Sequence, residues 1–169
     1  MVWCPVKFTL FLSKKRILNK TRKEKKKLLS SLWFPIIFTI ILWIVESLEA
    51  LTGSNFADYG LFPLDFKGLR GIIFAPLLHG NWEHLFNNSI PIFFLMWALH
   101  YFYKQISLKV FFLIYFIHGF WLWFLGRDAY HIGASGLVYG LAAFLFVSGI
   151  IRKNTHLLAI SLLVAFLYG

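Results

Sequence analysis

The sequence predicts an all-α membrane protein: a helical bundle with four full transmembrane helices, a partial fifth, and an outer loop that dips into the membrane. Hydrophobic residues make up 59% of the 169 residues and aromatic residues 20%, which is more apolar surface than a soluble domain of this length can bury. The apolar residues also fall in long runs that carry few charges, and most of the basic residues lie between these runs.

Four apolar stretches are long enough to cross the bilayer core, which is about 30 Å thick and needs roughly 20 residues of helix. We expect these spans over residues 31–51, 85–103, 106–125 and 129–151. A fifth apolar stretch, residues 157–169, has only 13 residues and is predicted to be a partial span. The chain therefore resembles a bundle whose last helix is incomplete.

The basic residues set the expected orientation, because lysine and arginine are retained on the cytoplasmic side of a membrane. Ten of the 17 precede the first span, so residues 1–30 are predicted to be a basic cytoplasmic segment ahead of a transmembrane domain over residues 31–169. Residues 52–83 then form a long outer loop. Alternation places four further basic residues on the inner side: Lys104, Lys109, Arg152 and Lys153.

The net charge of +10 raises the question of a nucleic-acid partner. Its concentration beside a hydrophobic span is better explained by topology and by attraction to anionic lipid, so we expect the lipid bilayer as a partner and no nucleic acid. Cys4 is the only cysteine, which excludes an internal disulfide and a thiol cluster. No metal or other cofactor is implied.

Polar side chains inside apolar spans are costly and are therefore the first candidates for function. His84 and Asn88 are four residues apart, so they share one face near the outer start of the second span. Both side chains can donate hydrogen bonds to the oxyanion of an acyl-transfer intermediate. Ser135 lies between Gly133 and Gly136 at the outer end of the fourth span, where the helix dipole favours negative charge. This arrangement predicts a serine nucleophile.

Two stretches of the sequence together resemble the rhomboid family of intramembrane serine proteases. Residues 79–88, His-Gly-Asn-Trp-Glu-His-Leu-Phe-Asn-Asn, are similar to the family's second-helix segment ending in H-x-x-x-N. Residues 133–140, Gly-Ala-Ser-Gly-Leu-Val-Tyr-Gly, are similar to its G-x-S-G-x-x-x-G fourth helix. The resemblance covers residues 68–169. Leu69 precedes Arg70 where many members carry a Trp-Arg pair, so no role is carried over for that loop.

The resemblance implies that Ser135 attacks the scissile carbonyl of a transmembrane protein substrate near the outer face. His84, Asn88 and the Ser135 amide would bind the oxyanion. Tyr139, four residues after Ser135, would support the histidine base, and we expect His79 to hold the outer end of the second helix. In the family that base lies on a sixth transmembrane helix. The sequence ends before such a helix, so we expect the 169-residue chain alone to be inactive.

No other side chain of this sequence is expected to replace that base. Lys153 and His156 fall on the opposite side of the bilayer from Ser135. His118 and His100 are expected at the wrong depth within their spans. His131 lies on the correct side but precedes the fourth span, and no partner in the sequence would orient it, so it stays a minor alternative.

Less specific interpretations remain open. Small-residue motifs such as residues 133–136 also serve close helix packing, and His84 and Asn88 can be ordinary interhelical hydrogen-bonding groups. The alternative function is a non-catalytic rhomboid-like protein that binds transmembrane segments; a binder, however, has no need of a nucleophile. An unrelated structural or transport protein is disfavoured, because no broken helix with paired charges is evident. The spacing from His79 to Glu83 and His84 does not fit the H-x-x-E-H zinc motif.

Overall fold

The computed structural model describes the backbone of residues 5–168 and the side chains of residues 16–168. That part of the chain is helical, with no β-strand and one isolated antiparallel bridge between Leu61 and His131. The all-α membrane fold predicted from composition is therefore confirmed. The elements in chain order are α1 (Pro5–Thr52), η1 (Phe56–Tyr59), η2 (Lys67–Arg70), α2 (Gly71–Phe74), η3 (Ala75–Leu77), α3 (Trp82–Phe102), α4 (Ser107–Leu125), α5 (Ser135–Ile151) and α6 (Thr155–Tyr168).

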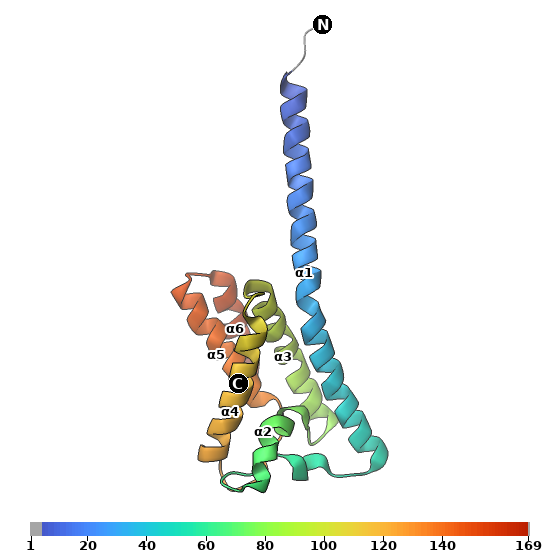
Figure 1. Cartoon of the computed structure of the whole chain (residues 1–169), viewed down its shortest axis with the longest axis vertical. Helices are drawn as coiled ribbons and strands as arrows, with labels where there is room; N and C mark the ends of the chain where they lie inside the picture. Colours follow the sequence, from blue (N-terminus) through green and yellow to red (C-terminus); the bar gives the residue numbers. More distant parts are fainter. Residues whose placement is uncertain (1–4, 169) are drawn as a thin grey trace.

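Helix α1 is a single helix of 48 residues (Figure 1). Its C-terminal half packs along α3, and its N-terminal half stands clear of the bundle. The basic segment expected over residues 1–30 and the first span are thus parts of one helix over the described residues, with no break at residue 30. Lysine, arginine and leucine all have a high helix propensity, so α1 continues without a break from the basic segment into the apolar one.

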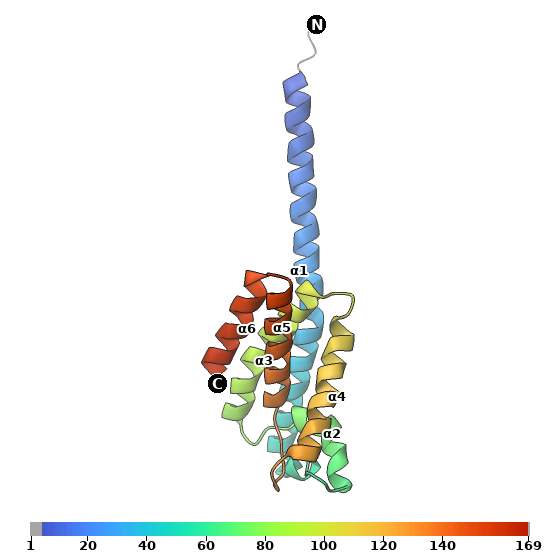
Figure 2. The same ribbon diagram turned by 90° about the vertical axis from the view of Figure 1, so that its left-hand side faces the viewer.

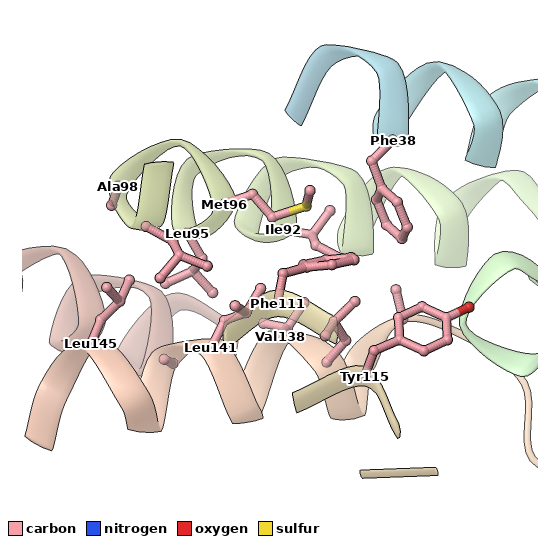
Figure 3. Close-up of a cluster of buried hydrophobic side chains, with 14 of the residues drawn as sticks. Phe38, Ile92, Leu95, Met96, Ala98, Phe111, Tyr115, Val138, Leu141 and Leu145 are labelled. Atoms are coloured by element: carbon pink, nitrogen blue, oxygen red, sulfur yellow. The ribbon is translucent and has the colours of Figure 1, made fainter. Parts of the chain in front are cut away.

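Helices α3 and α5 form the centre of the bundle, and Figure 2 shows α4 and α6 on opposite sides of this pair. The buried side chains recur every three or four residues along each central helix, as one apolar face of a helix requires. In Figure 3 the Phe111 ring of α4 lies between side chains of α3 and α5, and it meets Phe38 of α1 edge-on at 5.3 Å between ring centroids. The fully buried leucines of the central pair are Leu85, Leu95, Leu99, Leu137, Leu141 and Leu145.

Among the described residues, two helices are long and apolar enough to cross a bilayer, namely α1 and α4. Helix α3 has 21 residues, whereas α5 has 17 and α6 has 14. Helix α5 is shorter than expected because it begins at Ser135 rather than near Ala129. The backbone turns at Gly133, with φ of 103°, and His131 pairs with Leu61 instead of joining the helix. The predicted start of the fourth span is therefore wrong.

The outer loop braces the bundle from the side through short helices. Gly119 of α4 leaves room for Ile72 of α2, because a Cβ at residue 119 would lie 2.8 Å from the Ile72 Cγ2. The Tyr115 hydroxyl of α4 donates a hydrogen bond to the carbonyl oxygen of Ile73. Tyr115 lies ten residues before Leu125, so the loop reaches about 15 Å down α4 from its outer end. This depth fits the expected membrane-dipping loop.

Candidate active site

The His84 ring lies against the turn that leads into α5. Asn81 caps α3, and its side chain accepts a hydrogen bond of 2.8 Å from the His84 backbone N–H. A Cβ at residue 133 would lie 2.7 Å from both Cε1 and Nε2 of His84. Gly133 also has φ of 103°, a conformation that other residues rarely adopt. Only glycine therefore admits the imidazole here, two residues before Ser135.

Ser135 begins α5, so its backbone N–H has no partner within the helix. Ala134 precedes it as the N-cap residue and supplies no side-chain hydrogen bond to the first turn. The entry to the helix is held instead by the Gly133 N–H, which donates to the carbonyl oxygen of Ala75 at 2.8 Å. The outer loop thus fixes the turn that presents Ser135.

Asn88 lies one turn after His84 on the same face of α3 and is fully buried. Its Nδ2 donates to the carbonyl oxygen of His84 at 2.9 Å. Its Oδ1 accepts a hydrogen bond of 2.7 Å from the hydroxyl of Tyr168 on α6, and this hydroxyl also lies near Ser135. Side chains of α3, α5 and α6 therefore meet at one depth. Tyr168 is not predictable from the sequence as a site residue, because no local motif contains it.

His79 is buried beside His84, just before α3. Only 1% of its surface is exposed, and its ring centroid lies 5.1 Å from that of His84. Neither ring nitrogen of His79 has a hydrogen-bond partner among the described side chains and backbone. Burial, and secondarily the charge that His84 can carry, lowers the pKa of His79 to about 4. His79 is thus neutral at neutral pH and packs its ring edge-to-face on the ring that touches Gly133.

A family model described as the Rhomboid domain matches residues 67–169. The chain belongs to the rhomboid family. It is 36% identical over 140 residues to the uncharacterized protein Rv1337 of Mycobacterium tuberculosis, and the match covers 79% of this chain and 58% of that protein. It is 33% identical over 141 residues to the uncharacterized protein ML1171 of Mycobacterium leprae, covering 79% of this chain and 55% of the relative. No solved structure matches.

The rhomboid chain thus spans little more than half the length of these curated relatives. Its Tyr139, expected to support the base, is about half exposed and lies one turn after Ser135. The Tyr139 ring contacts that of Tyr168, with 5.5 Å between centroids. Tyr139 therefore faces α6, and its support of a base stays a prediction.

His118 of α4 lies beside the start of α5. A Cβ at residue 136 would lie 1.7 Å from its Nε2, so the imidazole packs directly on Gly136, the residue after Ser135. One turn deeper, Ile114 packs on Gly140 in the same way. The expectation that His118 lies at the wrong depth is wrong. His118 lies seven residues, or about 10 Å, before the end of α4 at Leu125, and α5 begins at this level because residues 126–134 lead down to it as a loop.

Among the described residues, the contacts of the other histidines and of Lys153 do not include Ser135. His131 faces the loop, where its Nε2 lies 3.0 Å from the carbonyl oxygen of Arg127. His100 packs on Phe34, with 4.9 Å between ring centroids. Lys153 and His156 follow the far end of α5. Among the described residues, no group of three or more histidine, cysteine, aspartate or glutamate side chains could hold a metal ion.

A groove of about 720 Å³ separates α3 from α6 and ends at the candidate site. Its wall is mostly apolar, and its polar end is formed by His84, Asn88 and Tyr168. Asn87 and Phe94 line it from α3, and Leu163 and Leu167 line it from α6. The groove therefore leads from the apolar flanks of two helices to the groups around Ser135.

Proposed function

We propose that this rhomboid chain carries the nucleophile and the oxyanion-binding groups of an intramembrane serine endopeptidase. Ser135 is the nucleophile, and His84, Asn88 and the Ser135 N–H bind the oxyanion. The contact between the His84 ring and Gly133 gives the strongest support. It brings a side-chain donor of α3 beside the unpaired backbone N–H groups at the start of α5, where negative charge is favoured.

The chemistry requires a base that accepts the Ser135 proton as the bond from Oγ to the substrate carbonyl carbon forms. The carbonyl oxygen then becomes an oxyanion, and the base returns the proton to the leaving amine. The family resemblance assigns the base to a histidine on a sixth transmembrane helix, which would follow α6. Tyr139 would support this base in the assembled site, whereas the Cβ direction of Gly136 is occupied by the His118 ring.

Asn88 is suited to donate because its amide is held in one orientation. An asparagine side chain has two N–H donors, and the His84 carbonyl takes only one of them. The Tyr168 hydroxyl occupies the oxygen of the same amide. The second N–H of Asn88 is thus left for an oxyanion. Because Asn88 is fully buried, this donor acts in a site with little competing water.

The groove between α3 and α6 supports a transmembrane segment as the substrate. Its volume of about 720 Å³ and its mostly apolar wall fit apolar side chains better than a water-exposed loop. Its polar end lies at His84 and Asn88, where a backbone carbonyl of the segment would be held. The groove therefore favours membrane proteins as substrates.

A fluorophosphonate probe, which reacts with activated serines, tests this proposal. We expect labelling of Ser135 in a longer chain that continues past α6 into a histidine-bearing sixth transmembrane helix, and no labelling of the 169-residue chain. Ser135→Ala should abolish labelling, whereas Ser47→Ala on the exposed side of α1 should leave it unchanged.

One result would count against the protease, and another against the assignment of its base. Labelling of neither chain, together with retained binding of a transmembrane peptide, would favour the alternative of a non-catalytic rhomboid-like binder. Labelling of the short chain at Ser135 would show that a base lies within residues 1–169, and the assignment of the base to a sixth helix would then be wrong.

A further inference from the structure

The strongest charged feature of the molecule lies at the opposite end from Ser135. Between Arg16 and Lys27, helix α1 carries seven lysine or arginine residues and one acidic residue, Glu24. Nearly all of these side chains are exposed, because this part of α1 stands clear of the bundle (Figure 1). Where α1 reaches the bundle, it meets the last turn of α3 and the residues just after it.

Five side chains form a basic corner at this meeting point: Glu24, Lys27 and Ser30 of α1, and Tyr101 and Lys104 at the end of α3. The Tyr101 hydroxyl donates to Glu24 Oε2 at 3.2 Å, and the Lys27 ammonium lies 4.2 Å from the centroid of the Tyr101 ring. The Lys104 ammonium donates to the Ser30 hydroxyl at 3.2 Å. Both ammonium groups are therefore held in place by neutral partners, while the one carboxylate is engaged by a tyrosine.

The basic corner lies at the boundary between the apolar part of the bundle and water. Leu28 and Leu29 follow Lys27 directly and are the first of a long apolar run. Trp33 is half exposed, and Trp97 donates from its Nε1 to the Ser31 hydroxyl at 3.0 Å. Tryptophans gather at the headgroup level of a bilayer. The ammonium groups of the basic corner thus lie at the level of lipid phosphates.

We propose that the basic corner binds the phosphate of an anionic phospholipid. Lys27 and Lys104 supply the two positive charges. The acyl chain of the lipid lies along the exposed side chains of Leu29 and Trp33. A juxtamembrane cluster of lysine and arginine attracts anionic lipid in general. Two ammonium groups fixed against Tyr101 and Ser30 make the basic corner a tighter phosphate site than the other basic residues of α1. The proposal is independent of proteolysis, because it concerns the other end of the bundle.

The same helix provides a matched control. Lys20 and Arg16 lie seven and eleven residues before Lys27, or about 10 and 16 Å farther along the helix axis. Charges in physiological salt are screened over about 8 Å. Removing Arg16 and Lys20 therefore changes the net charge as much as removing Lys27 and Lys104, yet it leaves the basic corner intact.

Native mass spectrometry of the purified full chain in detergent, titrated with phosphatidylglycerol or phosphatidylcholine, tests the proposal. We expect phosphatidylglycerol to bind about thirtyfold more tightly than phosphatidylcholine. The double variant Lys27→Gln and Lys104→Gln should lose about thirtyfold in affinity for phosphatidylglycerol, because each cation near a lipid surface contributes about 1 kcal/mol. The double variant Arg16→Gln and Lys20→Gln should change it by less than about twofold.

Three outcomes would overturn the proposal. An equal loss in both double variants would mean that the lipid feels only the overall charge. Equal binding of the two lipids to the unmodified chain would mean that the basic corner does not select an anion. Full displacement by soluble glycerol 3-phosphate at the same concentration would assign the corner to a free phosphate ester rather than to a lipid.

Two further variants separate a loss of charge from a loss of shape. Lys27→Arg combined with Lys104→Arg keeps both charges and should keep the preference for phosphatidylglycerol, whereas a loss of that preference would contradict the role of charge. Glu24→Gln removes the acidic residue of the corner and should raise affinity for phosphatidylglycerol about threefold. Unchanged or weaker binding in this variant would also contradict the proposed site.

Discussion

The hydroxyl of Tyr168, in the last turn of α6, donates a hydrogen bond of 2.7 Å to Oδ1 of Asn88, 80 residues earlier in the chain. Asn88 is fully buried, so this hydroxyl satisfies an oxygen that water does not reach. The same contact ties α6 to α3 at the polar end of the groove between them. One hydrogen bond therefore orients a candidate oxyanion donor and closes the groove.

Tyr168→Phe removes this hydroxyl and keeps the ring. We expect the free energy of unfolding to fall by about 1–3 kcal/mol, because a buried acceptor is left without a partner. Tyr139→Phe is the matched control, since Tyr139 is half exposed and its ring packs on that of Tyr168. Reversible unfolding in mixed detergent micelles measures both variants. Equal effects of the two substitutions would show that the hydrogen bond to Asn88 contributes nothing.

The spans and the site motifs were predictable because each depends on neighbouring residues. Apolar runs and basic flanks are local, and so are the patterns that contain His84, Asn88 and Ser135. The contacts of Tyr168 and His118 were not predictable in this way. They depend on how far one helix is shifted along another: His118 packs on Gly136 because the loop over residues 126–134 places the start of α5 level with it, and no local pattern sets that shift.

Gly136→Ala should be poorly tolerated, because the added methyl group would lie 1.7 Å from Nε2 of His118. We expect a loss of about 1–3 kcal/mol, which is typical of overpacking in a tight core. His118→Ala in the same chain should recover part of this loss by making room. A double-mutant cycle on unfolding free energies measures the coupling, which we expect to exceed about 1 kcal/mol.

The control for that cycle is Gly80→Ala, whose added methyl group would lie 3.6 Å from Cδ1 of Ile132, an ordinary contact distance. It should change stability by less than about 0.5 kcal/mol. Additive effects of Gly136→Ala and His118→Ala would contradict direct packing of the imidazole on α5.

Gly133→Ala tests the contact with His84 separately from backbone strain. Gly133 and Gly53 both have positive φ, of 103° and 64°, but a Cβ at Gly53 meets nothing within 4 Å. Gly53→Ala should therefore show only the backbone cost of about 1–2 kcal/mol. Gly133→Ala should cost more than this, since its methyl group would lie 2.7 Å from the His84 ring. Equal losses of unfolding free energy in the two variants would mean that the ring moves aside freely.

Acid should destabilise the protein through His79. The pKa of this buried ring is lowered to about 4 in the folded chain, whereas an unfolded histidine titrates near 6.5. Between these values the unfolded state binds more protons, so stability falls as the pH falls from about 6.5 to about 4, by up to about 3 kcal/mol. His79→Phe keeps an aromatic ring against His84 and removes the titrating group. We expect the unmodified chain to lose stability relative to this variant as the pH falls from 7.5 to 4.5 in thermal unfolding experiments. A constant difference between the two chains across that range would contradict the burial of a neutral His79.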